Sequence, residues 1–212
     1  MAEFFFGPFI LAFGTTTSVL LLFFSAVRRS RWLRRYEKFW FRFGGIAILF
    51  GFFSSLLLDG RVVMTPPLWG FVFGTLVLFG FSLWDDLSSL SWRTQIFFQI
   101  VLGLILFLFN VRILFVTNPL GGVWSFSSEV SLFPVFIVGL GWLLLVMNAL
   151  NWLDGSDGLC GGVSFIALIT IFFLTLKPEV NQPAFAIIAA GGAGSVLGFL
   201  LFNLPPARIF AG

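Results

Sequence analysis

The sequence predicts an all-α integral membrane protein, a polytopic bundle of about seven transmembrane helices. Of its 212 residues, 59% are hydrophobic and 10% are charged, and the mean hydropathy is +1.06, which is far more apolar than a soluble domain. Several runs of roughly 15 to 24 residues carry no charge, and a helix of that length can cross a bilayer. These runs are continuously apolar, whereas the strands of a membrane barrel alternate, so we expect helices to form every span.

Apolar runs bounded by polar residues, glycine or proline define the expected spans. We place them at 4–27, 43–58, 68–83, 95–109, 134–150, 163–176 and 184–202. Residues 110–133 contain Pro119 and a Gly-Gly pair among β-forming residues, a pattern that predicts a hairpin or an amphipathic turn outside the membrane. In the last span, Gly194 and Gly198 have the GxxxG spacing that permits close helix contact, and we interpret it as packing within this protein.

Basic residues indicate the orientation, because Lys and Arg are enriched in cytoplasmic loops. Seven of the twelve follow the first span, namely Arg28, Arg29, Arg31, Arg34, Arg35, Lys38 and Arg42. We therefore expect this loop inside the cell and the N-terminus outside. Alternation then brings the ends of the third, fifth and seventh spans, with WDDLSSL, NALNWLDGSDG and FNLPPARIFAG, to the cytoplasmic face. Because the basic residues are gathered in one loop, we expect the lipid bilayer, and no nucleic acid, as their partner.

The composition also limits the chemistry. The chain has no histidine and one cysteine, which excludes histidine bases, zinc sites and disulfides within the chain. We interpret Cys160 as a packing residue. Carboxylates must therefore carry any acid–base or metal chemistry.

Two pairs of aspartates stand at the expected cytoplasmic ends of spans. Asp85 and Asp86 follow the third span, where a carboxylate drawn to membrane depth costs about 2.5 to 3.5 kcal/mol; such a pair can also simply cap the next helix. Asp154 and Asp157 are three residues apart in DGSDG, which can place both carboxylates on one side of a helical turn or a tight loop. The two glycines of that motif let the backbone approach a ligand closely.

Asn148 and Asn151 extend the second pair into one polar stripe, since they precede Asp154 at intervals of three. Their amides can donate hydrogen bonds to phosphate or sugar oxygens. Four carboxylates at one mouth would repel one another unless a cation joins them, and oxygen ligands favour Mg²⁺ or Mn²⁺ over zinc. Because Mg²⁺ commonly bridges carboxylates to substrate phosphates, the pattern predicts a magnesium-dependent phosphotransfer site.

Four segments are similar to motifs of one known family. GFSLWDDLSSLSWRTQIFFQ resembles its Asp-Asp segment with a downstream Gln, here Gln99, and NALNWLDGSDGLCGG resembles its Asn-Ala-x-Asn-x-x-Asp-Gly-x-Asp-Gly-Leu signature. FRFGGIAI resembles a Pro-Arg-x-Gly-Gly segment, with Phe41 in place of the proline, and GFLLFNLPPARIFAG resembles the segment before a Gly-Asp-x-Gly-Ser motif. The family is that of the polyprenyl-phosphate N-acetylhexosamine-1-phosphate transferases, glycosyltransferase family 4.

The resemblance implies an enzyme of the bacterial cytoplasmic (inner) membrane. Such an enzyme moves an N-acetylhexosamine 1-phosphate from a UDP-sugar to undecaprenyl phosphate, releases UMP and starts a cell-envelope glycan. Carried over position by position, the resemblance implies catalytic and metal-binding roles for Asp85, Asp86 and Asp154. It implies substrate contacts for Asn148, Asn151, Asp157 and Asn203. For the oligomeric state, we consider a homodimer.

The end of the chain departs from the family pattern. The sequence stops at Gly212, where the resemblance implies a further Asp, further spans and a cytoplasmic loop with a histidine. We therefore expect residues 1–212 to be a single transmembrane domain of this family that is incomplete at its C-terminus, and to be inactive alone.

Three other functions fit part of the pattern. A phospho-N-acetylmuramoyl-pentapeptide transferase shares the resemblance, but WDD in place of three aspartates and FRFGG favour a UDP-N-acetylglucosamine donor. A non-enzymatic function in cation binding or transport would account for aspartates at the ends of the spans, but it would not account for the asparagines beside DGSDG. An intramembrane aspartyl protease needs its aspartates in mid-membrane, whereas these lie at the expected interface.

Overall fold

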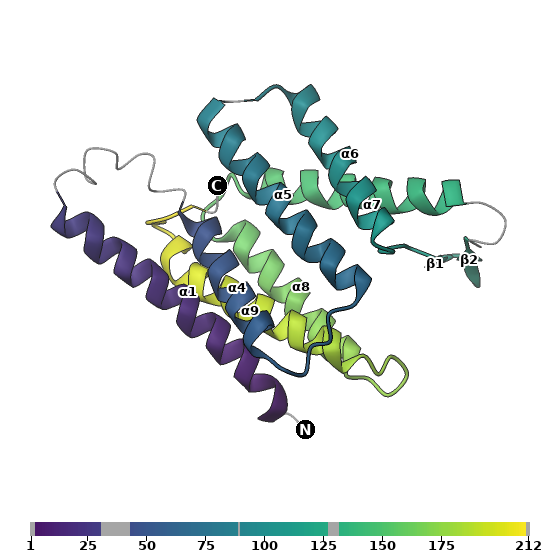
Figure 1. The fold of residues 1–212 in the computed structure, drawn as a ribbon, viewed down its shortest axis with the longest axis horizontal. Coiled ribbons are helices and arrows are strands. Elements are labelled where there is room, and N and C mark those ends of the chain that lie inside the picture. Colours follow the sequence, from purple (N-terminus) through teal and green to yellow (C-terminus); the bar gives the residue numbers. More distant parts are fainter. Residues whose placement is uncertain (1–2, 31–42, 89, 127–131, 211–212) are drawn as a thin grey trace. The chain divides into compact units, whose positions relative to one another are not determined.

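The structure is a computed structural model that describes residues 3–30, 43–88, 90–126 and 132–210 (Figure 1). Seven helices form in this part of the chain, and each coincides with one predicted span. They are α1 (Glu3–Arg29), α4 (Gly44–Leu58), α5 (Pro66–Ser88), α6 (Trp92–Leu108), α7 (Leu132–Leu153), α8 (Leu159–Thr175) and α9 (Pro183–Asn203). The prediction of an all-α polytopic membrane protein is confirmed.

The helices differ in length. α1, α5, α7 and α9 each contain at least 20 residues that are apolar enough to cross a membrane, whereas α4, α6 and α8 are shorter apolar helices of 15 to 17 residues. A helix of 17 residues rises about 25 Å, a little less than the hydrocarbon core of a bilayer. The basic loop after α1 lies, apart from Arg28 and Arg29, outside the described residues, as does Phe41 of the FRFGG segment.

The chain divides into two compact units. The first joins Met1–Val63 to Asn151–Gly212, and the second is Met64–Leu150. The division falls within α7, so Asn148 belongs to the second unit and Asn151 to the first.

In the first unit, α9 is the central helix and packs against α1, α4 and α8 (Figure 1). It is apolar all round and largely buried, as expected for a helix that is surrounded by others. Small residues allow this close approach: a methyl group added at Gly194 would overlap the backbone carbonyl of Phe9, and one at Gly198 would come within 3.0 Å of the Phe13 carbonyl oxygen. The GxxxG spacing therefore serves packing within the protein, as predicted.

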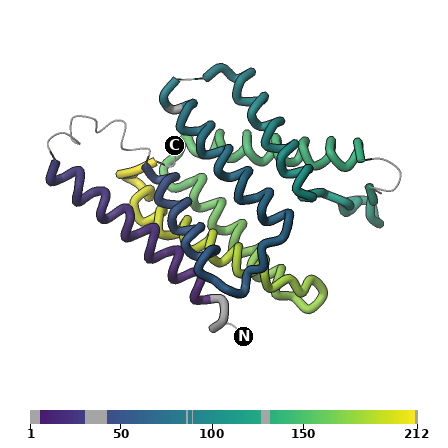
Figure 2. The backbone as a smooth tube through the Cα atoms, viewed as in Figure 1, coloured from purple at the N-terminus to yellow at the C-terminus, as the bar shows by residue number. Residues whose placement is uncertain are grey.

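The segment after α9 folds back over the same unit (Figure 2). The N–H of Gly44, at the start of α4, donates to the carbonyl of Phe210 at 3.0 Å, and the N–H of Arg208 donates to the carbonyl of Phe202 at 2.8 Å. Ile209 is fully buried beside Leu20. The returning segment is thus part of the core of the first unit.

The second unit contains α5, α6, α7 and a small hairpin. α6 packs on both neighbours: Gly70 of α5 lies against Phe109, which follows α6, and Phe107 meets Phe136 of α7 edge to face at 5.2 Å between ring centroids. Strands β1 (Phe115–Thr117) and β2 (Val123–Ser125) pair antiparallel between α6 and α7. The hairpin predicted in residues 110–133 is therefore present; its position outside the membrane stays a prediction.

Candidate active site

Asp85 lies in the last turn of α5, and two hydrogen bonds hold it there. The N–H of Leu90 donates to its Oδ1 at 2.8 Å, and Nε2 of Gln95 donates to its Oδ2 at 3.1 Å. Because Leu90 precedes α6 and Gln95 is in its first turn, the half-buried carboxylate ties the two helices together. Each oxygen keeps a second lone pair, so Asp85 can still coordinate a cation. Asp86 is the next residue of α5, and its side chain lies outside the described residues.

Asn148 and Gln99 join α7 to α6. Nδ2 of Asn148 donates to Oε1 of Gln99 at 3.0 Å and to the carbonyl of Leu144 at 2.7 Å. Both donors of the amide are thus used within the protein, and Oδ1 is the atom that Asn148 has left to offer a ligand. Asn151, one helical turn further on, is exposed. A substrate contact of either residue stays a prediction. If Asn148 contacts the substrate in this orientation, its Oδ1 accepts a hydrogen bond from it.

The DGSDG motif forms a turn of five residues between α7 and α8. The predicted polar stripe follows helical geometry only as far as Asn151, because α7 ends at Leu153. Gly158, the N-cap of α8, has φ +73°, a left-handed conformation that favours glycine. A methyl group at this position would also come within 3.1 Å of the Leu204 side chain. Gly158 therefore serves the left-handed turn and leaves room for the chain after α9, two needs that lie within the protein.

Asn203 braces this turn from the end of α9. Its Oδ1 accepts from the N–H of Gly158 at 3.0 Å, and its Nδ2 donates to the carbonyl of Ile209 at 2.8 Å. The side chain is buried, with 6% of its surface exposed. The structure thus assigns Asn203 a positioning role between the turn and the returning segment. Its predicted substrate contact stays untested, and its burial does not favour that contact.

The two aspartates of the turn differ in their surroundings. Asp157 is exposed, and its Oδ2 accepts from the N–H of Ala207 at 3.0 Å. Asp154 is half-buried, and its carboxylate accepts no hydrogen bond from the residues that the structure describes. Burial raises the pKa of Asp154 above its ordinary value. Of the two, Asp154 is the carboxylate that a cation would stabilise more.

The donor set fits a hard divalent cation. Asp154 offers carboxylate oxygens to which no described residue donates, and the carbonyl oxygens and hydroxyl of the turn are further oxygen donors of the kind that Mg²⁺ prefers. Within the described residues, no three Asp, Glu, His or Cys side chains come close enough to form a complete metal site. Asp85 and Asp86 belong to the second unit, and Asp154 and Asp157 to the first. The meeting of the two pairs at one site stays a prediction.

The contacts within this region were not predicted from the sequence, and two of them differ in the signal that the sequence contained. The sequence contained only a weak indication that Gln95 is the partner of Asp85, namely that Gln95 lies in the helix that directly follows the aspartates. The bond between Asn203 and Gly158 had none, because 45 residues separate the two. Only the return of the chain after α9 brings them together.

A sequence profile of glycosyl transferase family 4 matches residues 68–212. This range includes both aspartate pairs, the turn between α7 and α8, and Asn203. It covers more than half of the chain.

Curated relatives agree with this match. The chain is 28% identical over 180 residues to the probable undecaprenyl-phosphate N-acetylglucosaminyl 1-phosphate transferase of Bacillus subtilis, covering 84% of this chain and 48% of that protein. It is 34% identical over 185 residues to the phospho-N-acetylmuramoyl-pentapeptide-transferase of Synechococcus elongatus, covering 80% of this chain and 48% of that protein. The chain is also 30% identical over 230 residues to the phospho-N-acetylmuramoyl-pentapeptide-transferase of Levilactobacillus brevis. This alignment covers 97% of this chain and 68% of that protein. The chain spans about half the length of the first two relatives. It belongs to glycosyl transferase family 4.

Proposed function

We propose that the gene product transfers an N-acetylhexosamine 1-phosphate from a UDP-sugar to a polyprenyl phosphate in the membrane and releases UMP. The name of the Bacillus relative supports a polyprenyl phosphate as the acceptor and N-acetylglucosamine 1-phosphate as the group transferred. The structural observation that carries the proposal is the turn between α7 and α8. It presents a half-buried carboxylate, Asp154, which has no hydrogen-bond partner among the described residues, on a backbone braced from α9.

In this reaction an oxygen of the lipid phosphate attacks the β-phosphorus of the UDP-sugar. A new P–O bond forms there, and the bond from that phosphorus to the bridging oxygen breaks, so the oxygen leaves with UMP. Both reactants are anions, and the residues must hold them together against their repulsion. Asp85, which Leu90 and Gln95 hold in place, would serve this task by holding a cation between the reactants, and Asp157, which Ala207 holds, would contact the substrate.

We propose Mg²⁺ as the cofactor, with Mn²⁺ as a substitute. When bound, the cation neutralises charge that develops on the phosphate oxygens. Asp154 would hold it, together with Asp85 and Asp86 if the two pairs meet. Residues 1–212 contain no histidine and one cysteine, so the ligands that this part of the protein offers are mainly oxygens.

We propose that the site faces the cytoplasm of a bacterial inner membrane. Arg28 and Arg29 end α1, and Arg208 follows α9. Positive charge at these ends supports their cytoplasmic location. A soluble UDP-sugar would then reach the site from the cytoplasm, while the lipid phosphate comes from the bilayer.

A pentapeptide-bearing N-acetylmuramoyl donor is the second candidate. The Levilactobacillus relative of that name, which aligns over 97% of this chain, supports it. The two candidates differ in the donor alone. The third alternative, a non-enzymatic cation-binding or transport protein, is disfavoured because the chain belongs to a family of transferases.

The test is UMP release by the full-length gene product in membranes with undecaprenyl phosphate and Mg²⁺. UDP-N-acetylglucosamine and the UDP-N-acetylmuramoyl-pentapeptide are offered separately, and we expect release with the first. Asp154→Asn should lower the rate by at least about 100-fold, whereas Glu179→Gln, an exposed acid before α9, should not change it. Release from neither donor, or full activity of Asp154→Asn, would contradict the proposal.

A further inference from the structure

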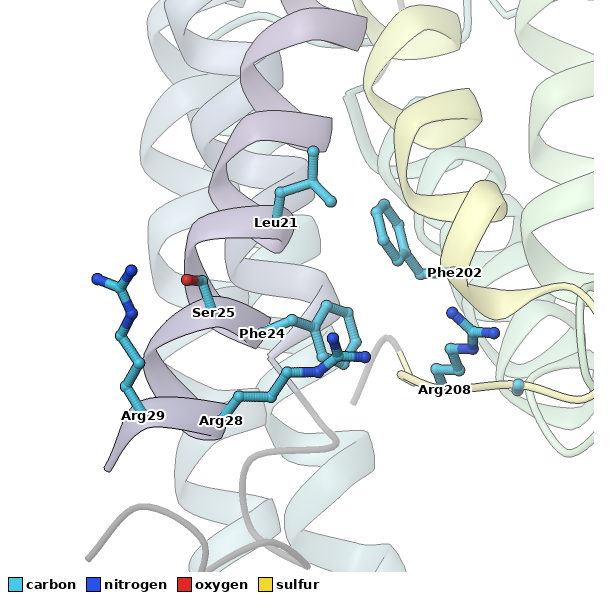
Figure 3. Close-up of a pocket in the computed structure, with 8 residues that line it drawn as sticks. Leu21, Phe24, Ser25, Arg28, Arg29, Phe202 and Arg208 are labelled. Atoms are coloured by element: carbon cyan, nitrogen blue, oxygen red, sulfur yellow. The ribbon is translucent and has the colours of Figure 1, made fainter. Parts of the chain in front are cut away.

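Arginine side chains line two of the cavities in the described part of the chain. The larger, of about 670 Å³, opens beside the end of α1 and contains Arg28, Arg29 and Arg208 (Figure 3). Arg28 already has a partner within the protein, so its charge does not by itself call for a ligand. The smaller, of about 240 Å³, lies in the second unit, and Arg112 is the one charged side chain among the described residues of its wall.

Arg112 follows α6 and packs on an aromatic ring. Its guanidinium carbon lies 4.8 Å from the ring centroid of Phe107. Its Nε is buried and has no hydrogen-bond partner among the residues that the structure describes, and the lining of the cavity there contains no carboxylate. A guanidinium stays charged at physiological pH, and one ring offsets only part of the cost of a charge in an apolar wall. The remaining donors of Arg112 therefore favour an anionic ligand.

A second cavity, of about 400 Å³, adjoins the first. The two share Ile113 and Trp142 in their walls, and the residues that line the second one are aliphatic, aromatic or glycine. Ile137, Gly141 and Leu145 follow one another at intervals of four along α7, so they lie on one face of this helix. This face rises about 12 Å, and it suits an apolar chain that runs along the helix.

Trp142 lines both cavities. It lies in the middle of α7, whereas tryptophans of membrane proteins gather at the two interfaces. Its side chain is 61% exposed. The ring combines a large apolar surface with a polar N–H, and here it lies where the cavity with a charge meets the apolar one. A ligand with a polar head and an apolar tail would contact it with both parts.

The two cavities lie far from the proposed transfer site. Gln95, in the first turn of α6, binds Asp85, whereas Arg112 follows the other end of that helix. The 17 residues of α6 rise about 25 Å. In the predicted orientation, Arg112 is at the outer face of the membrane, where a ligand can enter from the outer leaflet.

We propose that these two cavities bind one anionic phospholipid of the bilayer, with its phosphate at Arg112 and an acyl chain along Ile137, Gly141 and Leu145. A soluble anion would leave the apolar cavity without a ligand. A lipid without net charge would leave Arg112 without a net counter-charge. The proposal concerns binding and does not depend on the proposed transferase activity.

Native mass spectrometry of the delipidated full-length protein tests the headgroup contact. Phosphatidylglycerol and phosphatidylcholine with the same acyl chains are titrated separately, and the affinity for the first bound lipid is measured. We expect the wild type to prefer phosphatidylglycerol and Arg112→Gln to lower this preference about fivefold. Arg112→Lys should keep most of it. The matched control Lys177→Gln removes an exposed charge that lines neither cavity and should keep all of it.

Gly141→Leu tests the tail contact. A methyl group added at Gly141 meets nothing within 4 Å, so a larger side chain can enter the apolar cavity, and Leu favours the helix over Gly. We expect this variant to bind both lipids about fivefold more weakly, because the new side chain takes the place of the acyl chain. The control Gly162→Leu, on α8, is equally open at its added methyl group and lines neither cavity; it should bind as the wild type does.

Several results would overturn the proposal. They are equal affinity of the wild type for the two lipids, an unchanged preference in Arg112→Gln, an equal loss in Lys177→Gln, and unchanged binding by Gly141→Leu. Displacement of phosphatidylglycerol by an equal concentration of undecaprenyl phosphate would also overturn it, since the cavities would then hold the polyprenyl lipid. If Arg112→Gln does not fold, Arg112→Lys and Gly141→Leu decide.

Discussion

Gly158 and Asn203 are joined by a hydrogen bond of 3.0 Å from the backbone N–H of Gly158 to Oδ1 of Asn203. Gly158 is the N-cap of α8, and Asn203 is the last residue of α9. The same amide holds the carbonyl of Ile209. One buried side chain thus fixes the turn that carries Asp154 and Asp157 to the segment that returns over α4.

Asn203→Ala should destabilise the protein by about 2 kcal/mol, because it leaves the N–H of Gly158 and the carbonyl of Ile209 without their partner in a buried site. Thermal unfolding in detergent measures this. Asn151→Ala removes an exposed amide and should leave the unfolding temperature within error. Equal unfolding temperatures for the two variants would show that Asn203 is no brace.

Gly194→Ala should destabilise the protein by about 1 to 3 kcal/mol, because overpacking forces neighbouring backbones apart. The added methyl group would overlap the carbonyl of Phe9, a backbone atom that cannot turn aside. Gly14→Ala on the partner helix α1 is the matched control, since nothing lies within 4 Å of its added methyl group. There, the higher helix propensity of Ala should leave stability unchanged or slightly raised. If both variants unfold alike, α1 and α9 do not pack as closely as described.

The sequence predicts the helices of this protein better than its site. Apolar runs defined all seven helices within a few residues, because a membrane segment must satisfy its own backbone hydrogen bonds as helix. Helix ends were less predictable: α5 continues past the expected end at residue 83 to Ser88 and so includes both Asp85 and Asp86. Polar residues at an interface can prolong a helix, and hydropathy alone does not detect this.

The roles of individual site residues were harder to predict, because they depend on contacts across long stretches of chain. DGSDG identified a turn rich in carboxylates, but nothing in the motif shows that Gly158 serves an approach by Leu204. Asn148 and Asn203 looked like ligand contacts in the sequence. Their donors are used by Gln99, Leu144 and Ile209 within the protein, and such partners are visible only in the folded chain; a ligand contact of either residue stays a prediction.

Mg²⁺ should raise the unfolding temperature of the wild-type chain, and chelation should reverse the effect. A ligand at 100 times its Kd that binds only the folded state contributes about 2.7 kcal/mol. Asp154→Asn should lose most of this response and should itself be no less stable in chelator, because it removes a half-buried charge that has no hydrogen-bond partner among the described residues. Glu179→Gln should respond like the wild type. A full Mg²⁺ response in Asp154→Asn would remove Asp154 from the metal site.

Asp85→Asn separates a capping role of Asp85 from a chemical one. Asn keeps an oxygen that can accept from the N–H of Leu90, and the Gln95 amide can turn so that its oxygen accepts from the new amide nitrogen. The network stays satisfied, so we expect stability within about 1 kcal/mol of the wild type. UMP release by the full-length gene product should nevertheless fall by at least about 100-fold, because the negative charge is lost. Gln95→Ala keeps the charge but loosens its position, and it should cost about tenfold or less. Near-normal UMP release by Asp85→Asn, with Gln95→Ala equally active, would leave Asp85 only the task of joining α5 to α6.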